Sequence, residues 1–477
     1  MPKKFYITTS IAYVNSEPHI GFALECVQAD SLARYHRQKG SDVFFQTGTD
    51  EHGSKIQRTA EAANRSPQEF VDELTAKYVG LKDILNLSWD NFIRTTNRKI
   101  HWPVAEAIWL RLSASGDLYK KKYGGYYCIG CESFKTGKDI ENGKCIIHKK
   151  ELEYIEEENW FFKLSKYTKE IESIIKKDEL RIIPETRKNE ILALAKEGFE
   201  DVSFSRSKKH LEWGIPVPDD DGQVMYVWAD ALTNYISGYG GIEKWESHPA
   251  DVHMIGKDIS RFHAALWPAM LISAKLPLPK NIFIHGFITS GGEKISKSLG
   301  NAVDPYELVK KYGTDPVRYY LLREIPSTGD GDFSYEKFEE RYNGDLANGL
   351  GNFAARVLTL ASREGVLSGK PKKDTENFAA LVIKNIENFR FDMALNEIWN
   401  LIHYGDGYLN LTKPWSKDLP EKNRKEVLYD LVFILKTISD LLIPFLPETA
   451  EKISKAIEIS GDGFISKKID NLFPRLQ

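Results

Sequence analysis

Two strand–helix–strand patterns lie in this chain, and a long segment of different character separates them. The first pattern spans residues 5–46, with a β-prone run, a helical stretch that ends at Gly40, and a second strand. The second pattern spans residues 252–288. Because such a unit joins two parallel strands, the chain is predicted to be an α/β protein with a split Rossmann-like nucleotide-binding domain.

The rest of the chain is predicted to form separate modules. Long helical patterns without strand signals follow residue 335 or so, and they predict an all-α bundle. The expected boundaries are 1–114 for the first half of the catalytic domain, 115–222 for a connective insertion, 223–290 for the second half, 291–339 for a linking module and 340–477 for the helical domain.

Composition narrows the class of protein. The 477 residues are 42% hydrophobic and 28% charged, which suits a folded chain of several domains. The most apolar stretch, residues 431–446, is broken by Lys436 and Asp440, so no membrane span is predicted. The first residues show no signal peptide, and a cytoplasmic protein is expected. A net charge of −3 argues against non-specific nucleic-acid binding, although local basic patches occur.

A group of cysteines with metal-ligand spacing lies in the insertion. Cys128 and Cys131 form one close pair, and Cys145 and His148 form another. Four protein ligands leave no open position, so this spacing predicts one structural zinc ion and a zinc knuckle. The alternative is a set of reduced cysteines without metal. Cys26 is left over and is expected to pack in the core.

The tetrad His19-Ile20-Gly21-Phe22 opens the first predicted helix. A helix N-terminus attracts phosphate through its N–H groups and its dipole. Gly21 would let a nucleotide approach the backbone, and His19 could donate to a phosphate oxygen as charge develops. The simpler reading is that His19 only caps the helix.

A second short motif, Lys294-Ile295-Ser296-Lys297-Ser298, follows a glycine-containing loop after the last predicted strand. Two lysines at this spacing, with serine hydroxyl groups beside them, suit the phosphates of a nucleoside triphosphate. The alternative is a solvated basic loop.

Together, these two motifs resemble the HIGH and KMSKS signatures of the class I aminoacyl-tRNA synthetases. The resemblance implies that His19, Gly21, Lys294 and Lys297 bind ATP, which carries Mg²⁺, and that His19 and the two lysines stabilise the transition state. Phe22 departs from the family, because it replaces the second histidine of the signature. A contact normally made there must be absent or made by another group.

The methionine-specific branch of this family resembles the chain over nearly its full length. The matching segments are Ala12-Tyr13-Val14-Asn15, Gly48-Thr49-Asp50-Glu51-His52-Gly53, Val227-Trp228-Ala229-Asp230-Ala231, Gly256-Lys257-Asp258-Ile259 and Trp267-Pro268-Ala269-Met270.

This resemblance also implies which residues bind the amino acid. Asp50 is expected to hold the methionine ammonium, and Asp258 to lie near the ribose of ATP. The other expected pocket residues are Ile11, Tyr13, Trp228, Ala231, Leu232, Tyr235, Ile259 and His263. Aromatic rings suit a polarizable thioether, and Tyr13 or His263 could donate a weak hydrogen bond to it. For Trp228 and Tyr235, the alternative is plain core packing.

In the helical part, the resemblance implies recognition of the tRNA anticodon by Asn352, Arg356 and Trp415. The first two are four residues apart and share a helix face. An aromatic ring beside a guanidinium suits unstacked bases. The alternative is that Trp415 packs a turn onto the bundle.

The implied activity is the activation of L-methionine with ATP and its transfer to tRNA(Met). A leucine, isoleucine or valine enzyme would need a larger insertion, and a cysteine enzyme would place zinc in its amino-acid pocket. A non-catalytic tRNA-binding relative should have lost one of the two motifs, and a zinc-finger protein would leave the nucleotide-binding half unexplained. Many similar enzymes continue into an extra C-terminal dimerisation domain, whereas this sequence stops at Gln477, soon after the helical bundle. A monomer is therefore expected.

Overall fold

The computed structural model describes residues 2–130, 133–135, 139–147, 149–294, 303–371 and 374–476. The chain forms two compact units. The first contains residues 1–18, 40–82 and 88–284, and the second contains residues 19–39, 83–87 and 285–477. The first helix of the chain therefore belongs to the same unit as the C-terminal bundle.

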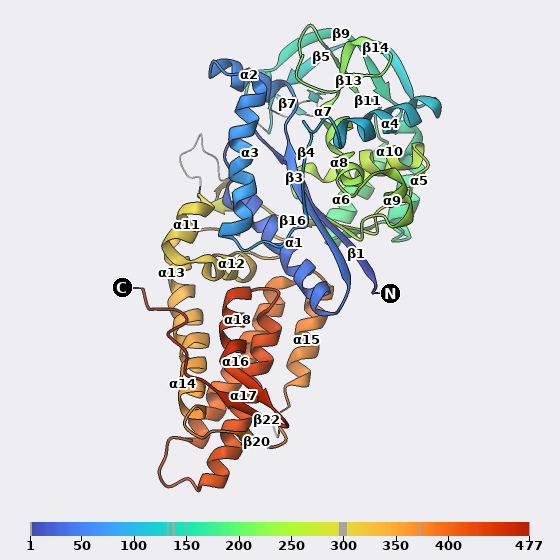
Figure 1. The fold of residues 1–477 in the computed structure, drawn as a ribbon. Coiled ribbons are helices and arrows are strands. Elements are labelled where there is room, and N and C mark those ends of the chain that lie inside the picture. Colours follow the sequence, from blue (N-terminus) through green and yellow to red (C-terminus); the bar gives the residue numbers. More distant parts are fainter. Residues whose placement is uncertain are drawn as a thin grey trace. The chain divides into compact units, whose positions relative to one another are not determined.

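A seven-stranded sheet lies at the centre of the first unit, in the order β10-β16-β15-β1-β3, with β2 and β4 both paired to β3 (Figure 1). The pairs β1–β15, β1–β3, β3–β2, β3–β4 and β10–β16 are parallel, in agreement with the parallel sheet that was predicted. The strands β2, β4 and β10 were not predicted from the sequence. The run Phe5–Thr9 is buried throughout, as expected for a strand of a parallel sheet that is covered on both faces. The strands are β1 (Lys4–Thr9), β2 (Ala12–Tyr13), β3 (Asp42–Asp50), β4 (Asn91–Arg94), β10 (Arg181–Ile183), β15 (Val252–Gly256) and β16 (Asn281–His285).

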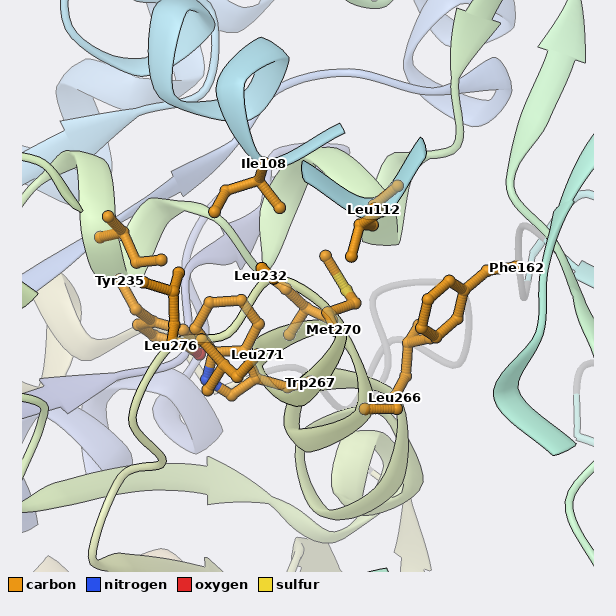
Figure 2. Close-up of a cluster of buried hydrophobic side chains, with 14 of the residues drawn as sticks. Ile108, Leu112, Phe162, Leu232, Tyr235, Leu266, Trp267, Met270, Leu271 and Leu276 are labelled. Atoms are coloured by element: carbon orange, nitrogen blue, oxygen red, sulfur yellow. The ribbon is translucent and has the colours of Figure 1, made fainter. Parts of the chain in front are cut away.

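Helices of the first unit contribute to its core together with the strands. They are α2 (Ser54–Ala62), α3 (Pro67–Ile84), α4 (His101–Ala114), α5 (Thr168–Lys176), α6 (Glu185–Glu197), α7 (Val227–Ala231), α8 (Asn234–Ser237), α9 (Ile242–Ser247) and α10 (Trp267–Ser273). A 3₁₀ turn, Lys257–Ile259, and a π-helical turn, Phe262–Leu266, precede α10. Figure 2 shows Ile108 and Leu112 of α4 near Leu232 and Met270, in the cluster that also contains Tyr235.

The insertion is built on antiparallel strands. A four-stranded sheet has the order β11-β9-β5-β6, and a three-stranded sheet has the order β12-β14-β13. The strands are β5 (Leu118–Cys128), β6 (Ser133–Lys135), β7 (Ile140–Glu141), β8 (Lys144–Cys145), β9 (Glu153–Phe162), β11 (Val202–Ser203), β12 (Ser205–Ser207), β13 (Pro216–Val217) and β14 (Asp220–Met225). The strands β7 and β8 form a separate hairpin.

The second unit begins with α1 (Ile20–Gln38) and includes a small sheet in the order β18-β17-β19. Its other elements before the bundle are β17 (Ile288–Ser290), β18 (Glu293–Lys294), α11 (Pro305–Tyr312), α12 (Thr314–Arg323), β19 (Gly331–Asp332) and α13 (Tyr335–Arg341). The strand predicted over 281–288 is thus two strands, β16 and β17, with a break at Gly286. The backbone of Gly286 lies so close to that of Gly329 that a Cβ on Gly286 would be 2.2 Å from the Gly329 carbonyl oxygen.

The C-terminal bundle consists of a π-helix over Tyr342–Gly351, α14 (Asn352–Ala361), α15 (Glu376–Glu387), α16 (Phe391–Thr412), α17 (Glu421–Leu442) and α18 (Pro447–Lys455) (Figure 1). The prediction that this part is entirely helical was wrong. Three short strands, β20 (Leu367–Ser368), β21 (Ile457–Ser460) and β22 (Gly463–Ser466), form a sheet. The last two make a hairpin around the two-residue turn Gly461-Asp462, a signal that the helical periodicity of the region obscured.

Across the described residues, every helix is too short or too polar to cross a bilayer.

Candidate active site

Several of the expected site residues lie at or just after the carboxyl ends of parallel strands, where open α/β sheets bind their ligands. Tyr13 of β2 pairs directly with Asp50, the last residue of β3. Asp258 and Ile259 follow β15, which ends at Gly256. The Asp50 side chain is buried and that of Asp258 is exposed.

An aromatic wall lies on the helical segments of the same unit. The rings of Trp228 and Phe262 stack at 4.0 Å with an angle of 7° between their planes. The His263 ring meets Trp228 edge-on at 6.0 Å. Phe262 was not predicted from the sequence, although it directly precedes His263. Half-buried Tyr13, Trp228 and Ile259 pack against the core cluster, which also includes fully buried Leu232 and Tyr235. Ala231 is buried beside Leu232, and Ile11 is half-buried.

Hydrogen bonds fix the orientation and the tautomer of His263. The carbonyl oxygen of Ile259 lies 3.1 Å from Nδ1, so this nitrogen donates. Nε2 lies 2.6 Å from the Tyr235 hydroxyl and accepts from it. Burial lowers the pKa of His263 to about 4, so the ring is neutral near pH 7. Both ring nitrogens are therefore engaged, and the hydrogen bond predicted from His263 to a thioether would require one of these bonds to be exchanged.

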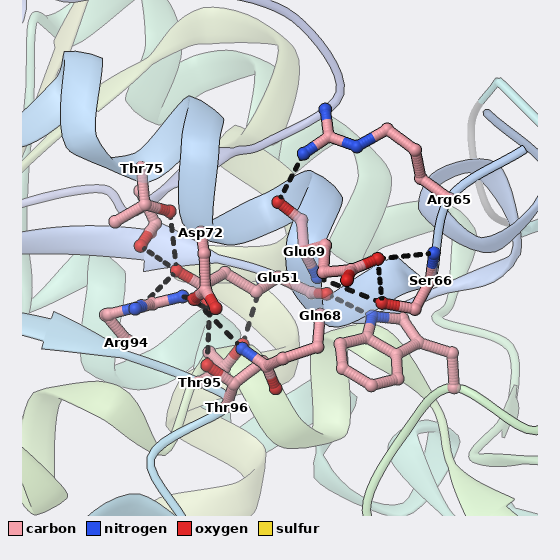
Figure 3. A network of polar contacts seen from close by, with 12 residues as sticks. Glu51, Arg65, Ser66, Gln68, Glu69, Asp72, Thr75, Arg94, Thr95 and Thr96 are labelled. Atoms are coloured by element: carbon pink, nitrogen blue, oxygen red, sulfur yellow. Dashed lines mark hydrogen bonds and ion pairs between the residues drawn. The ribbon is translucent and has the colours of Figure 1, made fainter. Parts of the chain in front are cut away.

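The carboxylate of Glu51 anchors the chain beside Asp50 (Figure 3). Its oxygens accept from the hydroxyls of Thr49 and Thr75 at 2.6 and 2.7 Å. They also accept from the guanidinium of Arg94 at 2.7 and 2.9 Å, and from the Thr96 hydroxyl. Glu51 is fully buried, and its several partners offset the cost of burying its charge. The end of β3 is thus held rigidly at the position where Asp50 is presented.

The second unit holds the first motif. His19 caps α1, and its Nδ1 accepts from the backbone N–H of Gly21 at 3.0 Å. The proton of the neutral ring is then on Nε2, which makes this nitrogen a donor. A Cβ on Gly21 would lie 2.9 Å from the His19 ring, so a larger residue at this position would displace the ring from its place over the helix end. His19 can therefore cap the helix through Nδ1 and donate to a phosphate oxygen through Nε2 at the same time. Phe22 is half-buried one residue further along the helix.

The second motif begins in the hairpin β17–β18, in which Thr289 pairs with Lys294. Gly291 and Gly292 have φ values of +62° and +79°, which favour glycine. Asp332 accepts from the N–H of Gly292 at 3.0 Å and from the Thr289 hydroxyl at 2.8 Å. These bonds lower the pKa of Asp332, with the Gly292 bond as the largest cause. Sequence reasoning missed Asp332. The predicted site residue Lys297 lies outside the described residues, as does everything between residues 294 and 303.

The expected anticodon-binding residues come together in the bundle. The Arg356 guanidinium lies 5.4 Å from the centre of the Trp415 ring. Arg356 also donates to Asp406 at 2.8 Å and to Asn410 at 2.7 Å, which were not predicted. The Trp415 side chain is 48% exposed. Asn352 is exposed one helical turn before Arg356. An aromatic ring that is half open to solvent and flanked by a fixed cation suits base stacking better than core packing.

Two of the four expected zinc ligands lie within the described residues. Cys128 ends β5 and Cys145 ends β8, each directly before a turn, and both are buried. The other two, Cys131 and His148, lie outside them. Within the described part of the chain, no three His, Cys, Asp or Glu side chains form a group that could hold a metal ion. This leaves the four-ligand set untested.

Comparisons with known proteins decide the family. The sequence matches the family described as tRNA synthetases class I (M) over residues 5–141 and 135–358. It matches the anticodon-binding domain of tRNA ligase over residues 373–471. The chain belongs to the methionine class of the class I tRNA synthetases.

Individual relatives agree with this assignment. A methionine–tRNA ligase of Caldanaerobacter subterraneus is 42% identical, with coverage of 97% of this chain and 75% of that protein. One from Brucella suis is 39% identical, with coverage of 96% and 93%. The structure of a Mycobacterium tuberculosis methionyl-tRNA synthetase in complex with methionyl-adenylate aligns with a TM-score of 0.91 and 36% identity, over 99% of this chain and 100% of that one. The α/β fold with a helical anticodon-binding domain is therefore confirmed.

Proposed function

We propose that this chain activates L-methionine with Mg-ATP and transfers it from methionyl-adenylate to the 3′ end of tRNA(Met). The observation that carries this proposal is the aromatic wall of Trp228, Phe262 and His263, in a chain of the methionine class. Phe262 and His263 follow β15 of the central sheet. Aromatic faces attract a polarizable sulfur atom, and a neutral histidine places no charge beside the uncharged thioether.

In the first step, the methionine carboxylate attacks the α-phosphorus and pyrophosphate leaves. The nucleophile is already ionised, so no general base is needed and catalysis depends on positioning and charge stabilisation. Asp50 is assigned to the methionine ammonium and Asp258 to the ribose. Nε2 of His19 donates to a phosphate oxygen as negative charge grows there.

The lysines of the second motif are assigned to the leaving pyrophosphate. Lys294 and Lys297 supply positive charge, and Asp332 holds the hairpin from which this segment begins. Bound Mg²⁺ would supply further charge neutralisation on the triphosphate. In the second step, a terminal ribose hydroxyl of tRNA attacks the acyl carbon of methionyl-adenylate and loses its proton, the bond from the acyl carbon to the phosphate oxygen breaks, and AMP leaves. Asn352, Arg356 and Trp415 recognise the anticodon.

Cys128, Cys131, Cys145 and His148 are proposed to hold one structural zinc ion. The placement of Cys128 and Cys145 at strand ends, with buried side chains, fits a pair of knuckle turns. A zinc ion there would stabilise a segment whose hairpins are too small for a core of their own. The domain boundaries stated above remain part of this proposal, except that β10, inside the range 115–222, pairs with β16 of the central sheet. The monomeric state remains a prediction, which light scattering of the purified chain would test.

The decisive experiment is ATP–pyrophosphate exchange with each of the twenty amino acids offered singly. Methionine alone should support strong exchange, and methionine should then be esterified to tRNA(Met). Exchange driven best by leucine, isoleucine or cysteine would contradict the proposal. The variant His19→Ala serves as a control for contaminating activity, because it retains the methionine pocket and loses the phosphate donor.

A further inference from the structure

A buried carboxylate in the first unit joins two histidines that no step of the reaction uses. Asp230 of α7 is fully buried. One of its oxygens lies 2.6 Å from Nδ1 of His52, and the other lies 2.6 Å from Nε2 of His101. Because an ionised carboxylate only accepts hydrogen bonds, both ring nitrogens donate to it. His101 continues the chain of contacts, with its Nδ1 2.8 Å from the hydroxyl of Ser237 in α8.

This carboxylate links the segments that carry the methionine pocket. His52 follows Asp50 by two residues, at the end of β3. Asp230 itself lies between Trp228 and Ala231 on α7. The ammonium-binding residue and the aromatic wall are therefore connected through the path Asp50, His52, Asp230 and Trp228, which crosses one charge-assisted hydrogen bond and otherwise follows short stretches of backbone.

The surroundings of His52 restrict its movement. The ring meets Trp213 at 5.5 Å and Trp102 at 6.0 Å, in both cases edge to face. The Trp213 indole N–H donates to the carbonyl oxygen of Glu51, the residue between Asp50 and His52. A shift of the His52 ring would therefore disturb the backbone that presents Asp50.

The electrostatic balance keeps Asp230 ionised. Burial alone would raise the pKa of this carboxyl, but the His52 and His101 rings outweigh burial and hold the pKa below its ordinary value. A buried charge is costly to maintain, and an apolar core would stabilise the fold at least as well. Its use here is better explained by the specific geometry that it imposes.

We infer that Asp230, held by His52 and His101, is a positioning residue for methionine, which keeps Asp50 and the Trp228 wall at a fixed separation. The inference rests on the proposed function. Asp230 touches no substrate in this scheme, since both of its oxygens point at imidazole rings. Loss of the link should weaken the binding of methionine and leave the binding of ATP unchanged.

The test compares Asp230→Asn with wild type in methionine-dependent pyrophosphate exchange. The KM for methionine should rise roughly tenfold or more, the effect expected when a buried hydrogen bond to a charge is lost. The KM for ATP, and kcat at saturating methionine, should stay within about threefold of wild type. Asp117→Asn is the matched control. Asp117 is also buried in this unit and bonded to Tyr167, Ser273 and Lys166, but it lies directly before β5 and bonds to neither His52 nor His101 in the described contacts.

Two further variants keep the inference testable if Asp230→Asn does not fold. His52→Asn retains a donor close to the Nδ1 position and should bind methionine better than His52→Ala. Equal methionine KM values for these two variants, or an equal rise in Asp230→Asn and Asp117→Asn, would overturn the inference. Failure of the wild-type protein to use methionine would instead overturn the proposed function.

Discussion

The Tyr235 hydroxyl donates to Nε2 of His263 across 2.6 Å, so His263 accepts a hydrogen bond at this nitrogen. This direction follows from the bond between Nδ1 and the carbonyl oxygen of Ile259 on the other side of the ring. Burial lowers the pKa of His263 to about 4 and so keeps the ring neutral near pH 7, with its single proton on Nδ1.

We expect His263 to make the fold less stable in acid. Burial lowers its pKa to about 4, whereas the same group in the unfolded chain titrates near 6.5. Between these values the unfolded state binds the additional proton, so the free energy of unfolding should fall as pH drops from about 6.5 to about 4. His263→Gln should reduce this slope, as measured by urea unfolding over that pH range. Identical slopes for variant and wild type would contradict the assignment.

Two substitutions at His19 should separate its cap from its catalytic role. His19→Ala removes the bond to the Gly21 N–H and should cost about 1 kcal/mol of unfolding free energy. It also removes the Nε2 donor and should slow pyrophosphate exchange by roughly 10²–10³-fold. His19→Asn keeps a capping oxygen but lacks that donor, so it should be nearly as stable as wild type and still slow. Normal exchange in His19→Asn would show that the histidine serves only as a cap.

The purified chain should contain about one zinc ion. Metal analysis of the wild-type protein tests this, and Cys128→Ser should lose most of the metal because one thiolate ligand is gone. Cys26→Ala is the matched control, since Cys26 is also buried but lies on α1, away from the insertion in sequence. A metal-free wild-type protein, or equal metal loss in both variants, would exclude the proposed zinc site.

Trp415→Ala should impair tRNA binding and leave methionine activation unchanged. If the ring stacks on an anticodon base, its loss should cost roughly 1–3 kcal/mol of tRNA binding, which is about a tenfold to hundredfold loss of affinity. Exchange without tRNA should not change, because no residue assigned to activation is altered.

The control for this prediction is Tyr335→Ala, which removes another half-exposed aromatic ring outside the bundle. Both variants are to be compared with wild type on tRNAs with the methionine anticodon and with an altered one. Undiminished discrimination between these tRNAs by Trp415→Ala would make Trp415 a packing residue.

The sequence determined the parts of this protein that depend on local pattern. The strand–helix–strand pattern placed β1, α1 and β3, because β-prone runs and helical spacing are properties of neighbouring residues. The two motifs and the methionine-type segments predicted the family, which the comparisons confirm. The hairpin of β21 and β22 was missed because four-residue strands leave too little pattern beside long helices.

Only the tertiary structure decided how residues distant in sequence act on one another. The partners of Asp230 are 178 and 129 residues away, and no local rule links an aspartate on a short helix with His52 and His101. The position of the Arg356 guanidinium over the Trp415 ring also follows from no local rule, because it depends on how α14 packs against the loop after α16. Hydrogen bonds and ring contacts of this kind arise from packing, so a one-dimensional pattern can supply the residues but not the pairs that they form.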